Sequence, residues 1–373
     1  MKITFNVDEL LPRLVAATSV INSKNTLPAL DNVLCEPKDG AMLITAADGE
    51  TWVTVKAPLM GCDGDAFPFL VGAKMFVSAL RNLSHKTVEL DVAKEKQSIR
   101  GKYDKGKFEY PFMDAGGFPS KTSIKEKKAT ITIGGNDLIK AINAVDFAAS
   151  TDMLRPIFCG VHFDFLHDSL VTVATDTRVL VKKSTPTAGN DSGDFSFTLP
   201  TKPSGLIAKL INAETDFVTI TYDESTIEIT DGDCFTMTAR TVSGKYPNYD
   251  AVIPKDNAIK VEVERNALVA AVNRVLTFGS STISLIILTL DFDDMIVSAQ
   301  NLDFATSAEE HIHVKYEGEK TSIGMNGEKL LELLRNQSGE RVILHVKDAA
   351  HAGIITNAQD EGYIQLFMPM QFA

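Results

Sequence analysis

Apolar and polar residues alternate with a period of two along residues 155–183, and this stretch shows how the chain is built. The alternating runs cover residues 158–165, 170–174 and 179–181, and polar groups at 167–169 and 175–177 separate them. Successive strand residues point to opposite faces of a sheet, so this pattern indicates consecutive antiparallel strands. Residues 136–149, just before them, have helical apolar spacing. The stretch therefore predicts a helix followed by a meander.

The same order of helix and meander occurs three times. The first copy is predicted as strand 2–7, helix 8–21, meander 31–57, strand 66–71, helix 73–83 and strands 87–92, 98–103 and 107–112. The second is predicted as strand 129–133, helix 136–149, meander 156–183, segment 192–200, helix 202–212 and strands 217–222, 226–230 and 234–241. The third is predicted as strand 258–263, helix 264–276, meander 284–308, segments 311–316 and 320–324, helix 327–336 and strands 341–346, 352–357 and 362–368.

Equivalent turn residues mark the repeat. Asp48, Asp176 and Asn301 follow the second meander strand of each copy, at intervals of 128 and 125 residues. Such a period is far longer than that of solenoid repeats, so each copy is a whole domain. Charged residues, proline and asparagine interrupt the pattern at 120–128 and 251–257. We therefore expect an α+β fold of three domains, residues 1–124, 125–253 and 254–373, each with helices on antiparallel sheets.

The strand edges of these domains need partners. Long unpaired edges favour aggregation unless they are paired or covered. Three similar domains can join edge to edge in one continuous curved sheet. A closed ring of six domains from two chains would leave no edge exposed, and an open arc of three domains is the alternative.

Bulk composition narrows the class of protein. The 373 residues suit two or three domains. The four cysteines are far apart and form no CxxC motif, which favours reduced thiols. The first residues begin an alternating strand, not a signal peptide, and no apolar run reaches the ~20 residues of a membrane helix. These features predict a cytoplasmic protein. The net charge of −12 argues against nucleic acid if it is taken alone.

Several short segments resemble one protein family over the whole chain. None is specific alone, but their order, their spacing and the threefold repeat together carry the resemblance. They are Thr26-Leu27-Pro28, Arg155-Pro156-Ile157, Ala174-Thr175-Asp176, Tyr246-Pro247-Asn248-Tyr249, Val252-Ile253-Pro254 and Met368-Pro369-Met370. The chain resembles the bacterial β sliding clamps, the processivity subunits of replicative DNA polymerases.

This resemblance implies a head-to-tail homodimeric ring around double-stranded DNA, bound without sequence specificity. It implies no catalysis and no cofactor, because a clamp tethers the polymerase topologically. It also implies a docking platform for the polymerase, the clamp loader and repair proteins, which bind through short linear motifs.

The implied ring requires basic side chains only on the helices that face DNA, so an acidic outer surface is compatible with it. Loose, water-mediated phosphate contacts would permit sliding. For any one of these residues, an ordinary solvated helix face is an equally good interpretation. Lys24 and Arg155 match family positions near DNA. The DNA-facing candidates are Lys24, Lys74, Arg81, Lys140, Arg155, Lys202, Lys209, Arg274 and Arg335.

The resemblance also implies a groove between the second and third domains that accepts leucine and phenylalanine anchors of partner motifs. The matching positions are Phe158, Thr175, Thr177, Arg178, Leu180, Pro247, Val252, Ile283, Asn326, Leu366, Phe367, Met368, Pro369 and Met370. Without the resemblance, 366–370 would be interpreted as an ordinary closing strand. The chain departs from the family pattern at Val179, Ala251 and Lys329, which puts the polar rim and the ligand preference in doubt.

At the implied dimer interface, Phe108 and Tyr110 of one chain would face Thr277 and Phe278 of the other. Burial within their own domain is the alternative for these residues.

Motifs of catalysis are missing from the sequence. It contains no GxxxxGK[ST], GxGxxG, HExxH or GxSxG pattern. His311 and His313 lack a nearby third metal ligand, and Asp63 and Asp65 lack the glutamate of a calcium loop. We therefore expect no metal site. The rival interpretations are an interaction scaffold that never encloses DNA and, with no supporting motif, an enzyme with an unrecognised acid pair.

Overall fold

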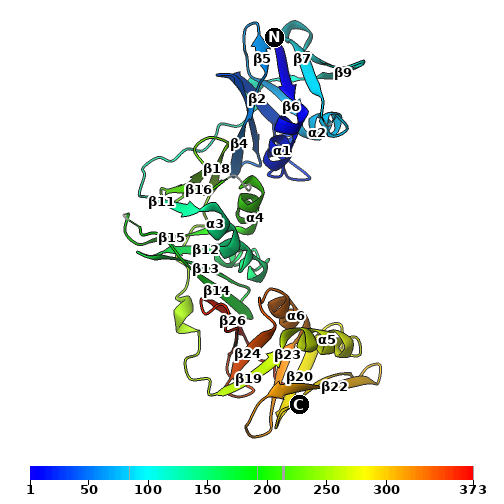
Figure 1. Ribbon diagram of the computed structural model, residues 1–373, viewed down its shortest axis with the longest axis vertical. Coiled ribbons are helices and arrows are strands. Elements are labelled where there is room, and N and C mark those ends of the chain that lie inside the picture. Colours follow the sequence, from blue (N-terminus) through cyan, green and yellow to red (C-terminus); the bar gives the residue numbers. More distant parts are fainter. Residues whose placement is uncertain (84, 191, 212–214, 373) are drawn as a thin grey trace. The chain divides into compact units, whose positions relative to one another are not determined.

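The computed structural model describes residues 1–83, 85–190, 192–211 and 215–372. It divides into two compact units: unit 1 contains residues 1–140 and 187–243, and unit 2 contains residues 141–186 and 244–373. Unit 1 therefore holds the first repeat and part of the middle repeat, and unit 2 holds the rest. Figure 1 shows both and labels many of their elements. Within the described residues, no helix combines the length and apolar character needed to cross a membrane.

Unit 1 is built from antiparallel sheets and three complete helices. Its strands are β1 (Lys2–Asn6), β2 (Asn32–Lys38), β3 (Ala41–Ala47), β4 (Thr51–Pro58), β5 (Gly61–Asp63), β6 (Phe69–Gly72), β7 (Thr87–Ala93), β8 (Ser98–Tyr103), β9 (Gly106–Pro111), β10 (Met113–Asp114), β11 (Ala129–Gly134), β15 (Phe195–Pro200), β16 (Phe217–Tyr222), β17 (Thr226–Thr230) and β18 (Phe235–Arg240). Its helices are α1 (Val7–Thr18), α2 (Ala73–Arg81) and α4 (Thr201–Leu210), with 3-10 turns at Pro28–Asp31, Lys94–Lys96 and Ala115–Gly117. Helix α3 (Gly135–Asn143) begins in unit 1 and ends in unit 2.

Unit 2 repeats this construction. Its strands are β12 (Gly160–Phe165), β13 (Ser169–Thr175), β14 (Val179–Pro186), β19 (Ile259–Glu264), β20 (Leu285–Asp291), β21 (Asp294–Asn301), β22 (Thr306–Lys315), β23 (Thr321–Asn326), β24 (Arg341–Val346), β25 (Gly353–Thr356) and β26 (Tyr363–Phe367). Its helices are α5 (Arg265–Leu276) and α6 (Gly327–Arg335), with 3-10 turns at Asp146–Ala148, Pro156–Phe158 and Tyr249–Ala251.

Helix α1 shows how the sequence places a helix on a sheet. Asn6 caps it by accepting the backbone N–H of Asp8 at 2.8 Å. Val7, Leu10, Leu14 and Ala17 recur at helical spacing and are buried, and the helix packs on β3 and β4. The predicted continuation to residue 21 is wrong, because the backbone N–H groups of residues 19–21 bond three residues back and tighten the last turn.

The strand order confirms the expected α+β fold with antiparallel sheets. Unit 1 has a five-stranded sheet, β5-β1-β7-β8-β9, and a nine-stranded sheet, β10-β6-β2-β3-β4-β18-β17-β16-β11. In unit 2 the strands follow one another as β12-β13-β14-β26-β25-β24-β19-β22-β21-β20-β23. In unit 2, α5 packs on β20, β21 and β22.

Neighbouring repeats join edge to edge, as the sequence predicted. In unit 1, β4 of the first repeat pairs with β18 of the middle repeat, from Phe235 opposite Val55 to Ala239 opposite Thr51. In unit 2, β14 of the middle repeat pairs with β26 of the third, and here Leu180 lies opposite Leu366. Both joints continue the backbone hydrogen-bonding ladder across a repeat boundary.

Several element predictions need correction. The predicted meander end at 308 and strand 311–316 are one strand, β22, whose side chains alternate over its whole length. Helix α3 ends at Asn143, and residues 146–148 form a separate 3-10 turn. The short strands β5 and β10 were not predicted, because two or three residues carry no measurable alternation. The predicted end of the helix over 202–212 lies outside the described residues.

An ion pair reinforces the joint within unit 1. The ammonium of Lys202 on α4 donates to Asp48 Oδ2 at 2.7 Å, to Asn22 Oδ1 at 2.6 Å and to the carbonyl of Val20. The other carboxylate oxygen of Asp48 accepts the backbone N–H of Thr51 at 2.8 Å. All three ammonium protons of Lys202 are therefore committed within unit 1.

We predict that Lys202→Met lowers the free energy of unfolding by about 1–3 kcal/mol, the usual cost of leaving a buried polar group unpaired. Asp48, with 10% of its side chain exposed, would lose its cation. Urea unfolding measures the change. Lys209→Met on the same helix is the control, since this exposed lysine pairs with no described residue and should change stability by less than about 0.5 kcal/mol. Equal stabilities of the two variants would contradict this role of Lys202.

Candidate partner-binding site

The strand pair β14–β26 separates the predicted pocket residues onto two faces. Leu180 and Leu366 lie opposite each other, and so do Val179 and Phe367. Because neighbouring residues of a strand point to opposite sides, the two leucines face one side of the sheet and Val179 and Phe367 face the other. The candidate site therefore consists of an apolar cluster and, on the opposite face, a cavity.

The apolar cluster contains Val171, Val173, Leu180, Tyr246 and Leu366, all buried. The predicted residue Phe158 packs against it, with its ring 5.9 Å from that of Tyr246. Burial raises the pKa of Tyr246, so its phenol stays protonated.

Sequence reasoning missed part of this cluster. Tyr246, Tyr249 and Ile253 belong to it, whereas the predicted neighbours Pro247 and Val252 are exposed and lie outside it. All five fall in two of the segments that carried the resemblance, residues 246–249 and 252–254. Choosing the large apolar residues of those segments would have found the cluster.

The cavity on the opposite face has a volume of about 370 Å³. It brings together the predicted residues Arg178, Asn326 and 367–370 with two positions that depart from the family pattern, Val179 and Lys329. Leu330 and Leu333 of α6 complete its apolar wall. The cavity thus combines apolar surface with two cationic side chains.

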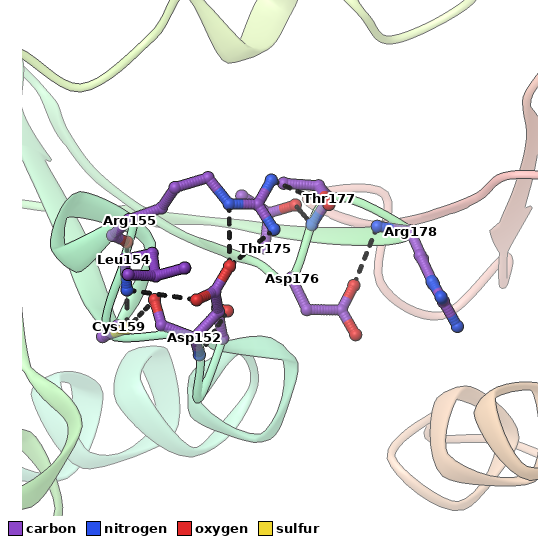
Figure 2. A network of polar contacts seen from close by, with 9 residues as sticks. Asp152, Leu154, Arg155, Cys159, Thr175, Asp176, Thr177 and Arg178 are labelled. Atoms are coloured by element: carbon purple, nitrogen blue, oxygen red, sulfur yellow. Dashed lines mark hydrogen bonds and ion pairs between the residues drawn. The ribbon is translucent and has the colours of Figure 1, made fainter.

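The turn from Thr175 to Arg178 is tightly hydrogen-bonded (Figure 2), and Arg178 at its end lines the cavity. Thr175 Oγ1 donates to the carbonyl of Val179 at 2.6 Å and accepts the backbone N–H of Thr177 at 3.0 Å. Asp176 Oδ1 accepts the N–H groups of Arg178 and Val179, both at 2.9 Å. Thr177 has φ of +75°, a left-handed conformation that is strained for a β-branched residue. The hydrogen bonds on both sides hold it there.

The C-terminal segment is fixed between two neighbours. The N–H of Met368 donates to the carbonyl of Arg178 at 2.9 Å, and that of Met370 donates to the carbonyl of Gly324 at 2.8 Å. A side chain at Gly324 would lie 2.4 Å from the Met370 carbonyl, so only glycine fits. Met368 itself remains half exposed.

The remaining predicted pocket residues lie beside helix α6. Asn326 caps the helix by accepting the N–H of Lys329 at 2.9 Å. Its amide donates to the carbonyl of Ile283 at 3.2 Å, and the Ile283 side chain is exposed.

Lys329 forms two ion pairs at the cavity. Its ammonium contacts Glu332 at 2.8 Å and Asp176 at 3.1 Å. Burial lowers the pKa of Lys329, but the hydrogen bonds with Glu332 and Asp176 outweigh it and raise the pKa above its usual value. The lysine is therefore charged throughout the neutral range.

The nine predicted DNA-facing residues fall into two groups. Lys202, Arg155, Arg274 and Arg335 have protein partners: Arg155 pairs with Asp152 at 3.0 Å, Arg274 with Glu310, and Arg335 donates to Asn273 at 3.2 Å. The others are exposed and form no ion pair with any residue described by the structure; they are Lys24, Lys74, Arg81, Lys140 and Lys209.

Lys74 and Arg81 lie near the two ends of α2 and line a cavity of about 860 Å³. Thr18, Asn22 and Ser23, at the end of α1, form the other side. The two cations and these hydroxyl and amide groups are of the kind that bind phosphate oxygens.

The predicted interface residues lie on β9 and, after α5, beside β22. Phe108 on β9 covers Gly101 of β8 and stacks on Tyr110, with ring centroids 5.7 Å apart. Tyr110 is only 6% exposed, so its ring belongs to the core of its own repeat. Phe278 is half exposed, and its carbonyl accepts the hydroxyl of Thr306 on β22 at 2.9 Å. Thr277 is exposed.

The two histidines of the H-x-H pair have partners within the protein. His311 Nδ1 contacts Asp294 at 2.7 Å, and His313 Nδ1 contacts the carbonyl of Asp293 at 3.0 Å. Among the described residues, no three His, Cys, Asp or Glu side chains gather as a metal site would require.

Three domain models of one protein match this chain in order. Residues 1–122 match the N-terminal domain of the DNA polymerase III beta subunit, residues 132–248 its central domain, and residues 250–371 its C-terminal domain.

Relatives match over full length. The beta sliding clamp of Pseudomonas putida is 26% identical, with 100% of both chains covered. The crystal structure of a sliding clamp from Pseudomonas aeruginosa, bound to griselimycin, has a TM-score of 0.94 at 24% identity over 100% of both chains. A griselimycin-bound clamp from Bartonella birtlesii has a TM-score of 0.91 at 25% identity, again over 100% of both. Since the three domain models follow one another from residue 1 to residue 371, the chain belongs to the DNA polymerase III beta subunit family, the bacterial β sliding clamps.

Proposed function

We propose that two copies of this chain close head to tail into a ring around duplex DNA, in the cytoplasm, with the three domains divided at residues 124/125 and 253/254. As a member of its family the chain is a processivity factor and not an enzyme. The observation that carries the ring is the pattern of strand edges. Neighbouring repeats are joined at β4–β18 and β14–β26, while edges of the first and third repeats remain unpaired among the described strands.

One free edge of the first repeat is β9, which ends its sheet and pairs only with β8 among the described strands. One free edge of the third repeat is on β22. Residues 306–313 of β22 pair with β21 on one side, but β19 reaches only residues 314 and 315 on the other. Two open edges on opposite end repeats fit a head-to-tail contact, because such a contact closes by strand pairing.

The side chains at the two edges suit each other, because both edges carry aromatic residues and the exposed charges have opposite signs. Beside β22, Leu302 is 84% exposed and Phe304 is 79% exposed, and Phe278 lies at the same edge. Phe108 provides an aromatic partner on β9. Exposed lysines at 105 and 107, on or next to β9, carry charges opposite to that of the exposed Glu309 on β22. Aromatic anchors surrounded by opposite charges are typical of stable interfaces.

We predict that Phe108→Glu or Phe304→Glu converts the protein to monomers at micromolar concentration, because each would bury a charge in the proposed interface. Light scattering should give twice the chain mass of 40.6 kDa for the unmodified protein and one chain mass for each variant. Phe292→Glu is the control, since Phe292 is similarly exposed but lies in the β20–β21 turn. A monomeric unmodified protein would favour the interaction scaffold over the ring.

We propose a smaller DNA-facing surface than the one predicted from the sequence. The exposed cations without ion pairs among the described residues, above all Lys74 and Arg81, are the candidates for phosphate contacts. Lys202 is not, because its protons bond within unit 1. Exposed lysines and arginines that bind phosphate loosely allow a ring to slide, since the contacts do not depend on base sequence.

We predict that the double variant Lys74→Gln, Arg81→Gln weakens binding to duplex DNA and reduces the slope of log K against log salt by about 1.8, because each phosphate that a side chain no longer neutralises lowers the slope by about 0.9. Fluorescence anisotropy over a salt series measures the slope. Lys202→Gln should lose stability but keep the slope. An unchanged slope in the double variant would remove this surface from the DNA path.

We further propose that the apolar cluster and the cavity around β14–β26 together bind short segments of partner proteins: the polymerase, the clamp loader and repair proteins. Met368 and Met370 suit such a site, because a flexible thioether adapts to several ligands. Griselimycin is bound in crystal structures of the clamps from P. aeruginosa and B. birtlesii, and we propose that it binds this chain at this site.

We predict that deletion of residues 368–373 abolishes binding of griselimycin and leaves the dimer intact. The deletion removes the segment fixed by the carbonyls of Arg178 and Gly324, and with it one wall of the cavity. Isothermal titration calorimetry measures the affinity, and light scattering checks the dimer. Undiminished affinity would show that the C-terminal segment is not part of the binding site.

A further inference from the structure

Three separate segments form the walls of the 370 Å³ cavity in unit 2. They are the β13–β14 turn, the junction of β23 with α6, and the C-terminal segment from Phe367 to Gln371. Backbone hydrogen bonds fix the C-terminal segment to each of the other two. One ion pair, Lys329 with Asp176 at 3.1 Å, connects the turn directly to α6.

Each partner of this ion pair has a second contact that does not cross the cavity. Asp176 uses Oδ2 for Lys329 and Oδ1 for the N–H groups of its own turn, where Figure 2 shows the bond to Arg178. Lys329 also contacts Glu332 on its own helix, at 2.8 Å. If the ion pair between the walls opens, the ammonium keeps one carboxylate and the turn keeps its cap. Opening therefore leaves the ammonium with one carboxylate and Asp176 with the two backbone N–H donors of its own turn.

We propose that the Lys329–Asp176 ion pair is a latch that determines which ligands the pocket admits: it holds the turn against α6 and opens when a bulky apolar side chain enters. This inference rests on the proposed partner-binding function.

The size of the cavity supports this role. About 370 Å³ is near the lower limit of the 300–1,000 Å³ typical of ligand sites. Lys329 itself lines the space, next to Leu330 and Leu333, so a large anchor on the apolar wall competes with the position that the lysine adopts in the closed pair.

The turn that carries Asp176 contains a strained residue. Thr177 lies next to Asp176 with φ of +75°, a conformation that costs a β-branched residue free energy. The ion pair is also only partly buried, with 33% of the Lys329 side chain and 17% of the Asp176 side chain exposed. Ion pairs of this kind are weak enough for a ligand to break and strong enough to bias the closed form.

The physical consequence is a population effect. When only the open form accepts a ligand, the apparent affinity is the intrinsic affinity reduced by the open fraction. Removing the latch raises that fraction, so affinity for an uncharged apolar ligand increases. An ion pair that merely shaped the pocket would have the opposite effect, because its loss would weaken binding.

The test is calorimetric titration of griselimycin into the full chain and four variants. Lys329→Met keeps the length of the side chain, and Asp176→Asn keeps an oxygen for the turn. Each should bind about two- to fivefold tighter than the unmodified protein, as expected for one partly exposed ion pair. The double variant should bind no tighter than either single variant, since both substitutions remove the same contact.

Lys320→Met is the matched control, because Lys320 forms an exposed pair with Asp291 that does not line this cavity. The affinity of this variant for griselimycin should equal that of the unmodified protein.

Salt provides a second readout. Between about 0.1 M and about 1 M salt the screening length falls from about 10 Å to about 3 Å, which weakens the latch. As salt rises, the affinity of the unmodified protein for griselimycin should therefore approach that of Lys329→Met. Any general effect of salt on apolar binding acts on both proteins equally, so it does not change the difference between them.

Equal or weaker binding by Lys329→Met at low salt would overturn the latch. If the unmodified protein fails to bind, binding by Lys329→Met alone would support the latch. If neither protein binds griselimycin, both the latch and griselimycin binding at this pocket are overturned. If the unmodified protein binds tightly and Lys329→Met binds equally well, the latch alone is overturned.

Discussion

The architecture depends on the need to pair strand edges. A repeat of this kind ends in strands with unused backbone hydrogen-bonding groups, and such edges are stable only when another strand covers them. The joints β4–β18 and β14–β26 solve this within the chain. Among the described strands, β9 and most of one side of β22 keep an unpaired edge, and the proposed dimer is the same solution applied between two chains.

The joint β14–β26 also creates the candidate binding site. Because side chains alternate along each strand, one pair of strands supplies Leu180 and Leu366 to an apolar cluster and Val179 and Phe367 to a cavity on the opposite face. The site therefore requires the joint: separating the middle and third repeats would remove both halves at once. Binding and assembly rest on the same backbone ladder.

Local patterns predicted much of this structure. Alternation and helical spacing located the repeats and every described α-helix, with errors of a few residues where a final turn tightened, as after Thr18. They could not specify which strands meet at the joints, because register between distant strands leaves no local signal. The same limit applied to the site. The residues predicted for the pocket include Phe158, Leu180 and Leu366, which the structure brings into one apolar cluster. No local signal showed that Lys202, predicted to face DNA, bonds to Asp48, which is remote in the chain.

The order in which the two joints can form follows from their positions in the chain. Strand β4 ends at residue 58 and its partner β18 begins at 235, and β14 ends at 186 and its partner β26 begins at 363; each interval is 177 residues. A ribosome adding about 5–20 residues per second needs roughly 10–35 s to synthesise such a length. During synthesis, each inner edge therefore waits exposed for that time. Newly made chains at high local concentration would find the same complementary edges on one another, so chaperones that shield nascent strands should matter more for this protein than its modest repeat size suggests.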